Sequence, residues 1–160
     1  MRIFACIVLL ITIAAIGFLA FCYFGAQMHI VAVYPTLTPA ASAPEAFAEL
    51  SRQLRIGAFR GALYHDVDLS NADAYVFLTL TVRMQNKGLL DQDYIQIHVQ
   101  NKPTDILQLA ADRTPSLAGQ SSADFSATLL IPAENADTLR SVRVTYYVLG
   151  RPYEASILGL

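Results

Sequence analysis

Four oxygen-bearing side chains lie close together in the sequence and could bind a calcium ion: Asp66, Asp68, Asn71 and Asp73. Asp66 and Asp68 alternate along the end of an expected strand, so both carboxylates would point to one side. Calcium needs several such oxygens, but the segment lacks the glycine and the bidentate glutamate of an EF-hand loop. Asp and Asn are also ordinary turn residues. The sequence therefore leaves both a calcium site and a plain turn open.

A second candidate site lies near the last expected hairpin and consists of Tyr147, Tyr153 and Arg151. Tyrosine and arginine side chains on one exposed face could stack against a sugar or another protein. The alternative is that Tyr147 and Tyr153 pair across the hairpin and only stabilise it.

Catalytic chemistry has little support in the sequence. We expect His98 on the solvated face of a strand, and His65 half-buried on the face of Leu63 and Val67. No Gly-x-Ser-x-Gly turn presents a nucleophile, and no pair of His or Cys has the spacing of a zinc site. We therefore predict no catalytic residues, no cofactor and no enzyme activity.

The charge balance is mild, with 11 basic and 13 acidic residues and a net charge of −2. Lysine and arginine form no run or cluster, so the chain lacks the electrostatic footprint of a nucleic-acid-binding protein. Both cysteines, Cys6 and Cys22, fall in the apolar N-terminal segment, and cysteine usage therefore says nothing of the redox compartment.

Residues 1–27 are expected to form an N-terminal transmembrane anchor. The segment from Ile3 to Phe24 has no charged residue, and as a helix it would be roughly 33 Å long, enough to cross a bilayer. The lipid bilayer is thus the predicted partner of residues 3–24. Arg2 precedes the helix and no basic residue follows before Arg52, so the positive-inside rule puts the N-terminus in the cytoplasm. The C-terminal domain would then be extracytoplasmic.

Two other interpretations of this segment remain open. Leu19 to Cys22 is similar to a lipobox, with Cys22 as the lipidated residue, although Phe21 stands where a small residue is usual. A cleaved signal peptide would need a shorter apolar stretch and a small residue in place of Phe24.

Residues 28–43 are expected to be a Pro/Ala-rich stalk, because Pro35 and Pro39 favour extended backbone and lack amide donors. A short helix over Pro44–Arg55 would follow, with Ser42 as its N-cap and Gly57 at its end. This helix and the rest of the chain make up one domain, residues 44–160.

From residue 59 onward the apolar residues alternate with polar ones, which is typical of strands with one buried face. Turn residues separate the strands. We predict a mainly β domain, a seven-stranded antiparallel β-sandwich. The expected strands are Ala62–Leu69, Tyr75–Asn86, Tyr94–Gln100, Ile106–Ala110, Ala123–Ile131, Leu139–Leu149 and Tyr153–Leu158.

Two stretches carry a resemblance to a known class of domain. The run from Leu80 to Val99 has a strand, an Asn-x-Gly turn and a second strand, and the run from Pro115 to Leu130 leads from a small-residue turn into a strand. Together they resemble the immunoglobulin-like and fibronectin type III-like sandwiches of bacterial cell-surface proteins, in particular the CARDB-type modules. The resemblance implies spacing, display or adhesion, and it brings no catalytic residue. The core tryptophan of antibody domains is absent.

The predicted function is therefore that of a membrane-anchored extracytoplasmic β-sandwich, a structural or protein-interaction module whose partner is another membrane or cell-surface protein. The alternative is a module that binds a glycan or calcium at the two candidate sites above.

Overall fold

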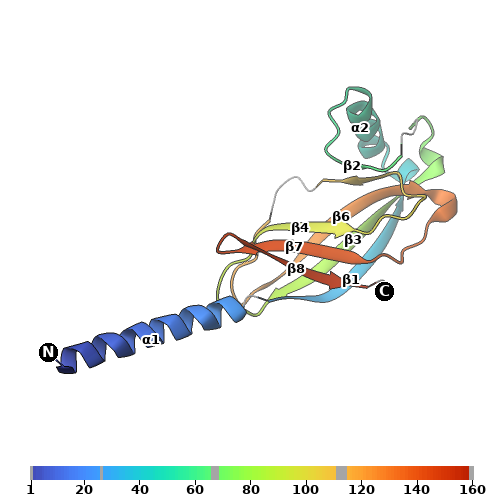
Figure 1. The fold of residues 1–160 in the computed structure, drawn as a ribbon. Coiled ribbons are helices and arrows are strands. Elements are labelled where there is room, and N and C mark those ends of the chain that lie inside the picture. The colour runs from blue at the N-terminus through green and yellow to red at the C-terminus, as the bar shows by residue number, and fades with distance from the viewer. Residues whose placement is uncertain (1, 26, 66–68, 111–114, 159–160) are drawn as a thin grey trace.

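The computed structural model describes residues 2–25, 27–65, 69–110 and 115–158. Within these ranges the chain forms one long N-terminal helix, a short second helix, and eight strands in two antiparallel sheets (Figure 1). The five-stranded sheet has the order β1-β3-β6-β5-β2, and the three-stranded sheet has the order β4-β7-β8. The fold is mainly β, as predicted, but it has one strand more than the seven expected.

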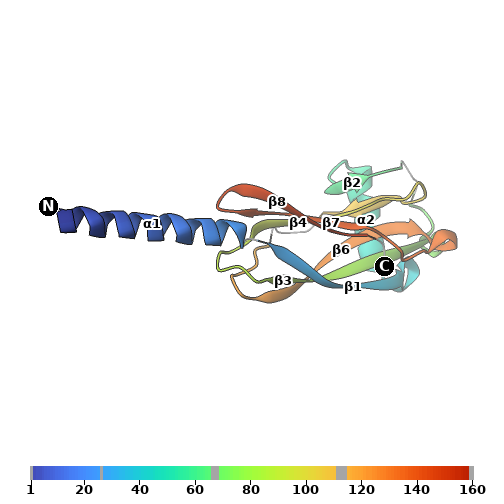
Figure 2. The ribbon, with the colours of Figure 1, turned by 60° about the horizontal axis from the view of Figure 1, so that its bottom comes forward.

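Helix α1, Arg2–Phe24, projects away from the strands as an extension of the molecule (Figures 1 and 2). Its stretch Ile3–Phe21 is long and apolar enough to cross a membrane, and none of it is buried inside the protein. Because leucine, isoleucine and phenylalanine side chains exposed over a whole helix are unfavourable in water, their complete exposure suits a lipid environment.

The predicted stalk is wrong for most of its length. Met28–Pro39 forms strand β1, which pairs with β3 along its entire length. β1 lies at the edge of the sheet, where a proline nitrogen can face the open side without breaking a ladder bond. Pro35 and Pro39 are therefore compatible with the strand. Ala40–Ser42 then forms a single 3-10 turn, and a compact segment takes the place of an extended spacer.

Helix α2 spans Pro44–Arg55, with the bounds that the sequence predicts. Its N-cap is Ala43, however, and the Ser42 hydroxyl donates instead to the Pro39 carbonyl, so the predicted N-cap is wrong. The helix ends as expected beside Gly57, whose φ of 66° is the left-handed conformation that glycine adopts readily.

The sheets form from alternating sequences, and six of the seven predicted strands agree with the structure to within three residues at each end; the first, predicted as Ala62–Leu69, stops at Leu63. The strands that follow β1 are β2 (Gly61–Leu63), β3 (Tyr75–Asn86), β4 (Asp93–Val99), β5 (Leu107–Leu109), β6 (Ser122–Pro132), β7 (Val142–Val148) and β8 (Arg151–Ile157). Residues 66–68, which the prediction gave to the first strand, lie outside the described residues.

The main core lies between the two sheets. Alternate residues of β3, including Leu80, point into it and meet Val144 and its neighbours on β7. Leu80 is 1% exposed and Val144 is fully buried, so both residues face one interior as predicted. This packing of two sheets face to face makes a sandwich architecture plausible (Figure 2).

A second, smaller core lies on the other face of the five-stranded sheet. Phe77 and Leu130 point to that face, and Phe47 and Leu50 of α2 pack on them. The helix thus buries its apolar stripe on its own domain. Since Phe77 and Leu130 interrupt the strict alternation of β3 and β6, both faces of these strands are buried near α2.

A side chain closes one edge of the sandwich. Gln108 of β5 donates through Nε2 to the Ile97 carbonyl at 2.9 Å, and its Oε1 accepts from the Val99 amide at 3.4 Å. The Gln108 amide group therefore continues the hydrogen-bonding pattern of β4 where no strand pairs with it. These two hydrogen bonds join the two sheets on the side opposite β1.

Candidate functional site

The structure brings together only part of the proposed calcium cluster. Asp66 and Asp68 lie outside the described residues. Asn71 accepts a hydrogen bond from the Asp73 amide at 3.1 Å and thereby caps the 3-10 turn Ala72–Ala74. That is the ordinary turn geometry of asparagine. Among the described residues, no group of three or more His, Cys, Asp or Glu is placed to hold a metal ion. The calcium site stays a prediction.

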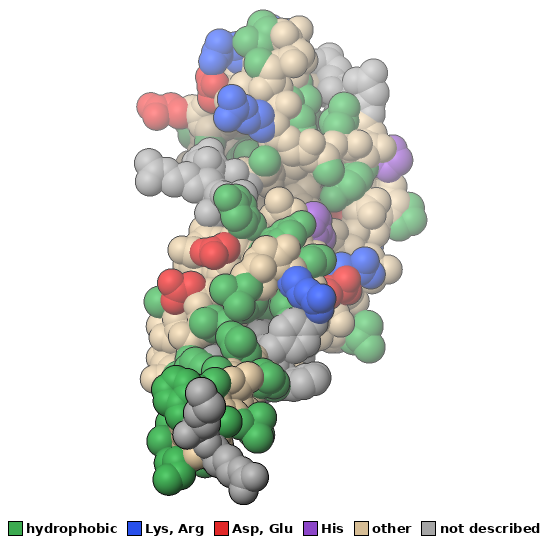
Figure 3. Space-filling view, turned by 60° about the vertical axis from the view of Figure 1, so that its left-hand side comes forward, with side chains coloured by type: hydrophobic (Ala, Val, Ile, Leu, Met, Phe, Trp, Pro, Cys, Tyr) green, Lys and Arg blue, Asp and Glu red, His purple; other side chains and the backbone are tan. Residues whose placement is uncertain are grey.

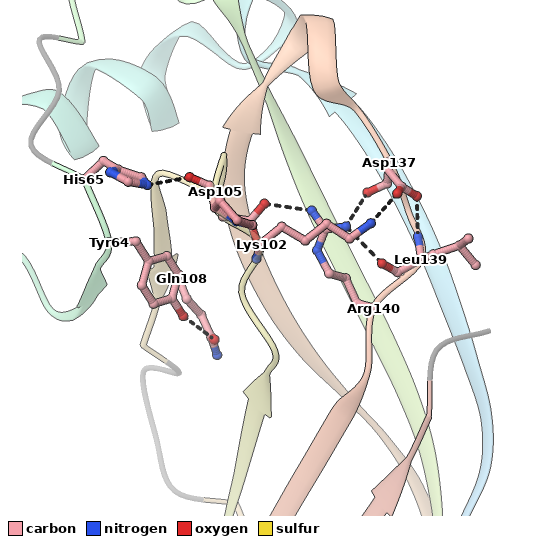
Figure 4. Close-up of polar contacts among 9 residues, drawn as sticks. Tyr64, His65, Lys102, Asp105, Gln108, Asp137, Leu139 and Arg140 are labelled. Carbon is pink, nitrogen blue, oxygen red and sulfur yellow. Dashed lines mark hydrogen bonds and ion pairs between the residues drawn. The ribbon is translucent and has the colours of Figure 1, made fainter.

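The two candidate histidines lie apart and face solvent. His98 is exposed, as expected, and its Nε2 lies 3.5 Å from the Thr145 hydroxyl. His65 is exposed rather than half-buried, and its Nε2 lies 2.6 Å from the Pro103 carbonyl oxygen (Figure 4). The hydrogen bond to Pro103 draws the ring over the turn that precedes β5, away from the apolar face on which the sequence places it.

The aromatic patch is divided between two faces of the β7–β8 hairpin. Tyr153 lies opposite Tyr146, and the two rings stack at 5.7 Å beside the main core. Tyr147 points to the outer face, where its ring contacts Tyr94 edge-on at 6.1 Å. Arg151 lies in register with Val148, on the same face as Tyr153. Neither the patch of three residues nor the pairing of Tyr147 with Tyr153 is therefore present.

Burial and a backbone contact together determine the state of Tyr146. Burial raises the pKa of its phenol, while a hydrogen bond that its oxygen accepts from the Met28 amide at 3.0 Å lowers it. Because the net shift is upward, the phenol is neutral at physiological pH. Its contact with Met28 ties the start of β1 to the three-stranded sheet.

A buried ion pair that the sequence analysis did not single out joins two loops (Figure 4). Arg140 Nη2 donates to Asp105 Oδ1 at 2.7 Å, and both side chains are almost completely buried. Asp105 also accepts from the Lys102 amide, and Arg140 Nη1 donates to the Asp137 and Leu139 carbonyls. The Arg140–Asp105 pair links the loop before β7 to the turn before β5, and the other bonds hold each partner within its own segment.

The rim of this ion pair carries a second, exposed pair. Lys102 forms an ion pair with Asp137. The Lys102 ammonium, together with the Leu139 amide, lowers the pKa of the Asp137 carboxyl. The arrangement has the features of a structural clasp between loops: its four charged groups form two ion pairs, although Arg140 Nε is buried without a hydrogen-bond partner among the described residues.

A groove on the outer face of the five-stranded sheet is the best candidate for binding. It is open to solvent and has a volume of about 530 Å³. It lies beside α2, next to the second core. Two kinds of side chain line it, apolar ones and hydroxyl-bearing ones. They are Thr38, Ala46, Phe77, Thr79, Leu109, Ala110, Ser126 and Thr128.

The hydroxyls in the groove are arranged in rows across the strands. Thr79 and Thr128 lie in register on β3 and β6, with their hydroxyl oxygens 3.1 Å apart. Thr81 and Ser126 repeat the arrangement at 3.3 Å. Further along the same face, Arg83 forms two hydrogen bonds with Asp124, and these lower the pKa of the carboxyl. The face therefore offers hydrogen-bonding groups to a partner without an unpaired charge among these residues.

Sequence reasoning missed the groove because its residues are ordinary polar positions of separate strands. The alternation in β3 places Thr79 and Thr81 on the outer face, but nothing in it indicates that α2 stands beside them. No family model matches the chain, and no curated protein matches it by sequence.

Proposed function

We propose that the chain is a single-pass membrane protein that displays its β-sandwich domain on the extracytoplasmic side, as a structural and protein-interaction module. The observation that carries the proposal is α1, an apolar helix with no buried residue in its candidate span, joined to a domain with its own complete core. A soluble domain would have to cover such a helix.

The outward orientation rests on charge. Arg2 is the first residue of α1 and lies before its apolar span Ile3–Phe21, and no lysine or arginine follows until Arg52. Basic residues are retained on the cytoplasmic side, so the N-terminus belongs there and the strands on the other side.

The groove beside α2 is the surface on which a partner would bind. It lies on the outer face of β3 and β6, next to the second core at the opposite end of the domain from α1 (Figure 1). A partner protein could reach this end while α1 remains in the bilayer. Its hydroxyl rows would donate and accept hydrogen bonds, while Ala46 and Leu109 would contribute apolar contact.

A photo-reactive amino acid incorporated at Thr128, in the groove, tests the proposal in cells. We expect illumination to produce one discrete adduct with a membrane or cell-surface protein. Gln96 is the matched control, because it is an exposed polar residue on β4 of the other sheet. No adduct from Thr128, or the same adducts from both positions, would contradict the interaction role.

A further inference from the structure

The end of the domain nearest α1 bears exposed apolar residues at the tips of separate loops. Leu149, at the tip of the β7–β8 hairpin, is 74% exposed, and Leu89, in the loop after β3, is 48% exposed. Tyr94 and Tyr147, which contact each other edge-on, are 61% and 38% exposed. We call these four residues the proximal rim.

The chain between α1 and the domain is too short to hold the rim away from a bilayer. α1 ends at Phe24 and β1 begins at Met28, four Cα–Cα steps later, so the connection spans roughly 14 Å at most. The domain also packs directly against Gly25, the residue after α1. A β-carbon placed on Gly88 would come within 2.9 Å of the Gly25 carbonyl oxygen. The loop after β3 thus touches the end of the helix.

The β7–β8 hairpin lies on another side of the same helix end. In both ribbon views its tip reaches the level of the last turn of α1 (Figures 1 and 2). Seen from the α1 side, hydrophobic side chains of the helix fill the lower part of the molecule, and others continue on the domain directly above them (Figure 3). A bilayer that contains α1 would therefore meet the hairpin tip.

Leu149 is also an unusual residue for its place in the hairpin. Leu149 and Gly150 have φ values of 50° and 76°, the pattern of a type I′ turn, whose first central residue is usually Asn, Asp or Gly. A leucine gains nothing locally from a left-handed backbone and a solvent-exposed side chain. A residue that opposes local folding preference in this way indicates a role outside the fold.

From these observations we infer that the proximal rim is a second membrane contact, in which Leu149 inserts at the bilayer surface and Tyr94 and Tyr147 lie in the headgroup region. The occupant of the rim is the same bilayer that α1 spans, and the inference rests on that part of the proposed function. Tyrosines suit the interface because the ring is apolar and the hydroxyl can remain hydrated. The contact would hold the domain in one orientation, with the groove beside α2 facing away from the membrane.

The test uses the absence of tryptophan from the chain. Three single-tryptophan variants of the full chain, Leu149→Trp, Leu139→Trp and Phe18→Trp, are each reconstituted in phosphatidylcholine–phosphatidylglycerol vesicles with brominated acyl chains. Leu139 is the matched control, since it is an exposed leucine at the far end of the domain, and Phe18 reports on α1 itself. We expect bromine to quench Leu149→Trp severalfold more than Leu139→Trp.

A second pair of variants controls for membrane insertion that the new tryptophan itself would cause. One variant is Tyr94→Trp with the natural Leu149, and the other combines Tyr94→Trp with Leu149→Asn. Asparagine suits the turn, so the fold should be as stable or more so, while quenching of Tyr94→Trp should fall.

The outcomes separate the two proposals. Strong quenching of Phe18→Trp with none of Leu149→Trp beyond the Leu139→Trp level would overturn the rim contact and leave the anchor intact. Quenching of Tyr94→Trp that is unchanged by Leu149→Asn would refute the role of Leu149. Absence of quenching in Phe18→Trp would overturn the anchor and the rim together.

Discussion

Replacing Asp105 with alanine should lower the free energy of unfolding by about 3–5 kcal/mol, because it leaves a buried guanidinium without its counter-charge. Asp105 and Arg140 have side chains that are 0% and 1% exposed, so water cannot take the place of the lost carboxylate. The Lys102 amide would also lose its acceptor. Urea denaturation of the full chain in detergent micelles measures the change.

An exposed ion pair in the same domain is the control for this experiment. Arg143 and Glu154 pair at 3.1 Å across β7 and β8, with side chains that are 64% and 51% exposed. Glu154→Ala should cost less than about 1 kcal/mol, because solvent screens such pairs. The double replacement Asp105→Leu with Arg140→Met should recover much of the loss. Equal costs for Asp105→Ala and Glu154→Ala would show that the buried pair is not formed.

Leu80→Ala should cost about 2–5 kcal/mol, from lost apolar burial and the cavity left between the sheets. Leu80 is 1% exposed and belongs to the main core with Leu78 and Val144. A domain of this size has only about 5–15 kcal/mol of stability in total, so the variant should denature at a much lower urea concentration.

Thr79→Ala is the matched control, since Thr79 is the next residue on β3 and faces the groove. It shares one hydrogen bond with the Thr128 hydroxyl, at a half-buried position. The cost should stay below roughly 1 kcal/mol. If Thr79→Ala proved as costly as Leu80→Ala, the face of β3 would be assigned wrongly, and the pairing of the two sheets with it.

Local periodicity predicted most of the strands well, because one face of each lies in the main core and the other face is more exposed, except where α2 covers part of β3 and β6. For β3 the predicted bounds agree with the structure, and Leu80 and its alternate neighbours are buried as predicted; Val76 is only half-buried, and Phe77 and Asn86 are buried although they were not expected to be. The same argument placed α2 correctly, since Phe47, Leu50 and Leu54 recur on one helical face.

The mistaken stalk shows the limit of reasoning from residue type alone. Pro35 and Pro39 exclude a central strand, but they are tolerated at an edge, and which strand lies at the edge is a property of the whole sheet. Ile30 and Val33 are three positions apart, which breaks the alternation expected of a strand, because a bulge between Ile30 and Ala32 shifts the register of β1.

The functional surfaces were even less accessible from sequence because they depend on distant residues. Asp105 and Arg140 are 35 positions apart, and each alone looks like an ordinary charged residue of a loop. Tyr147 and Tyr153 are close in sequence, yet the hairpin register puts them on opposite faces. Only the paired strands establish which residues share a surface.

The side of the membrane on which the domain lies tests the central proposal most directly. In a chain with Cys6→Ser and Cys22→Ser, a single cysteine is placed on exposed β4 as Gln96→Cys. Intact cells without a wall are treated with a maleimide that cannot cross membranes. We expect Gln96→Cys to react fully before permeabilisation, while a cytoplasmic marker protein stays unlabelled. Reaction of Gln96→Cys only after permeabilisation would contradict the proposal and place the domain in the cytoplasm.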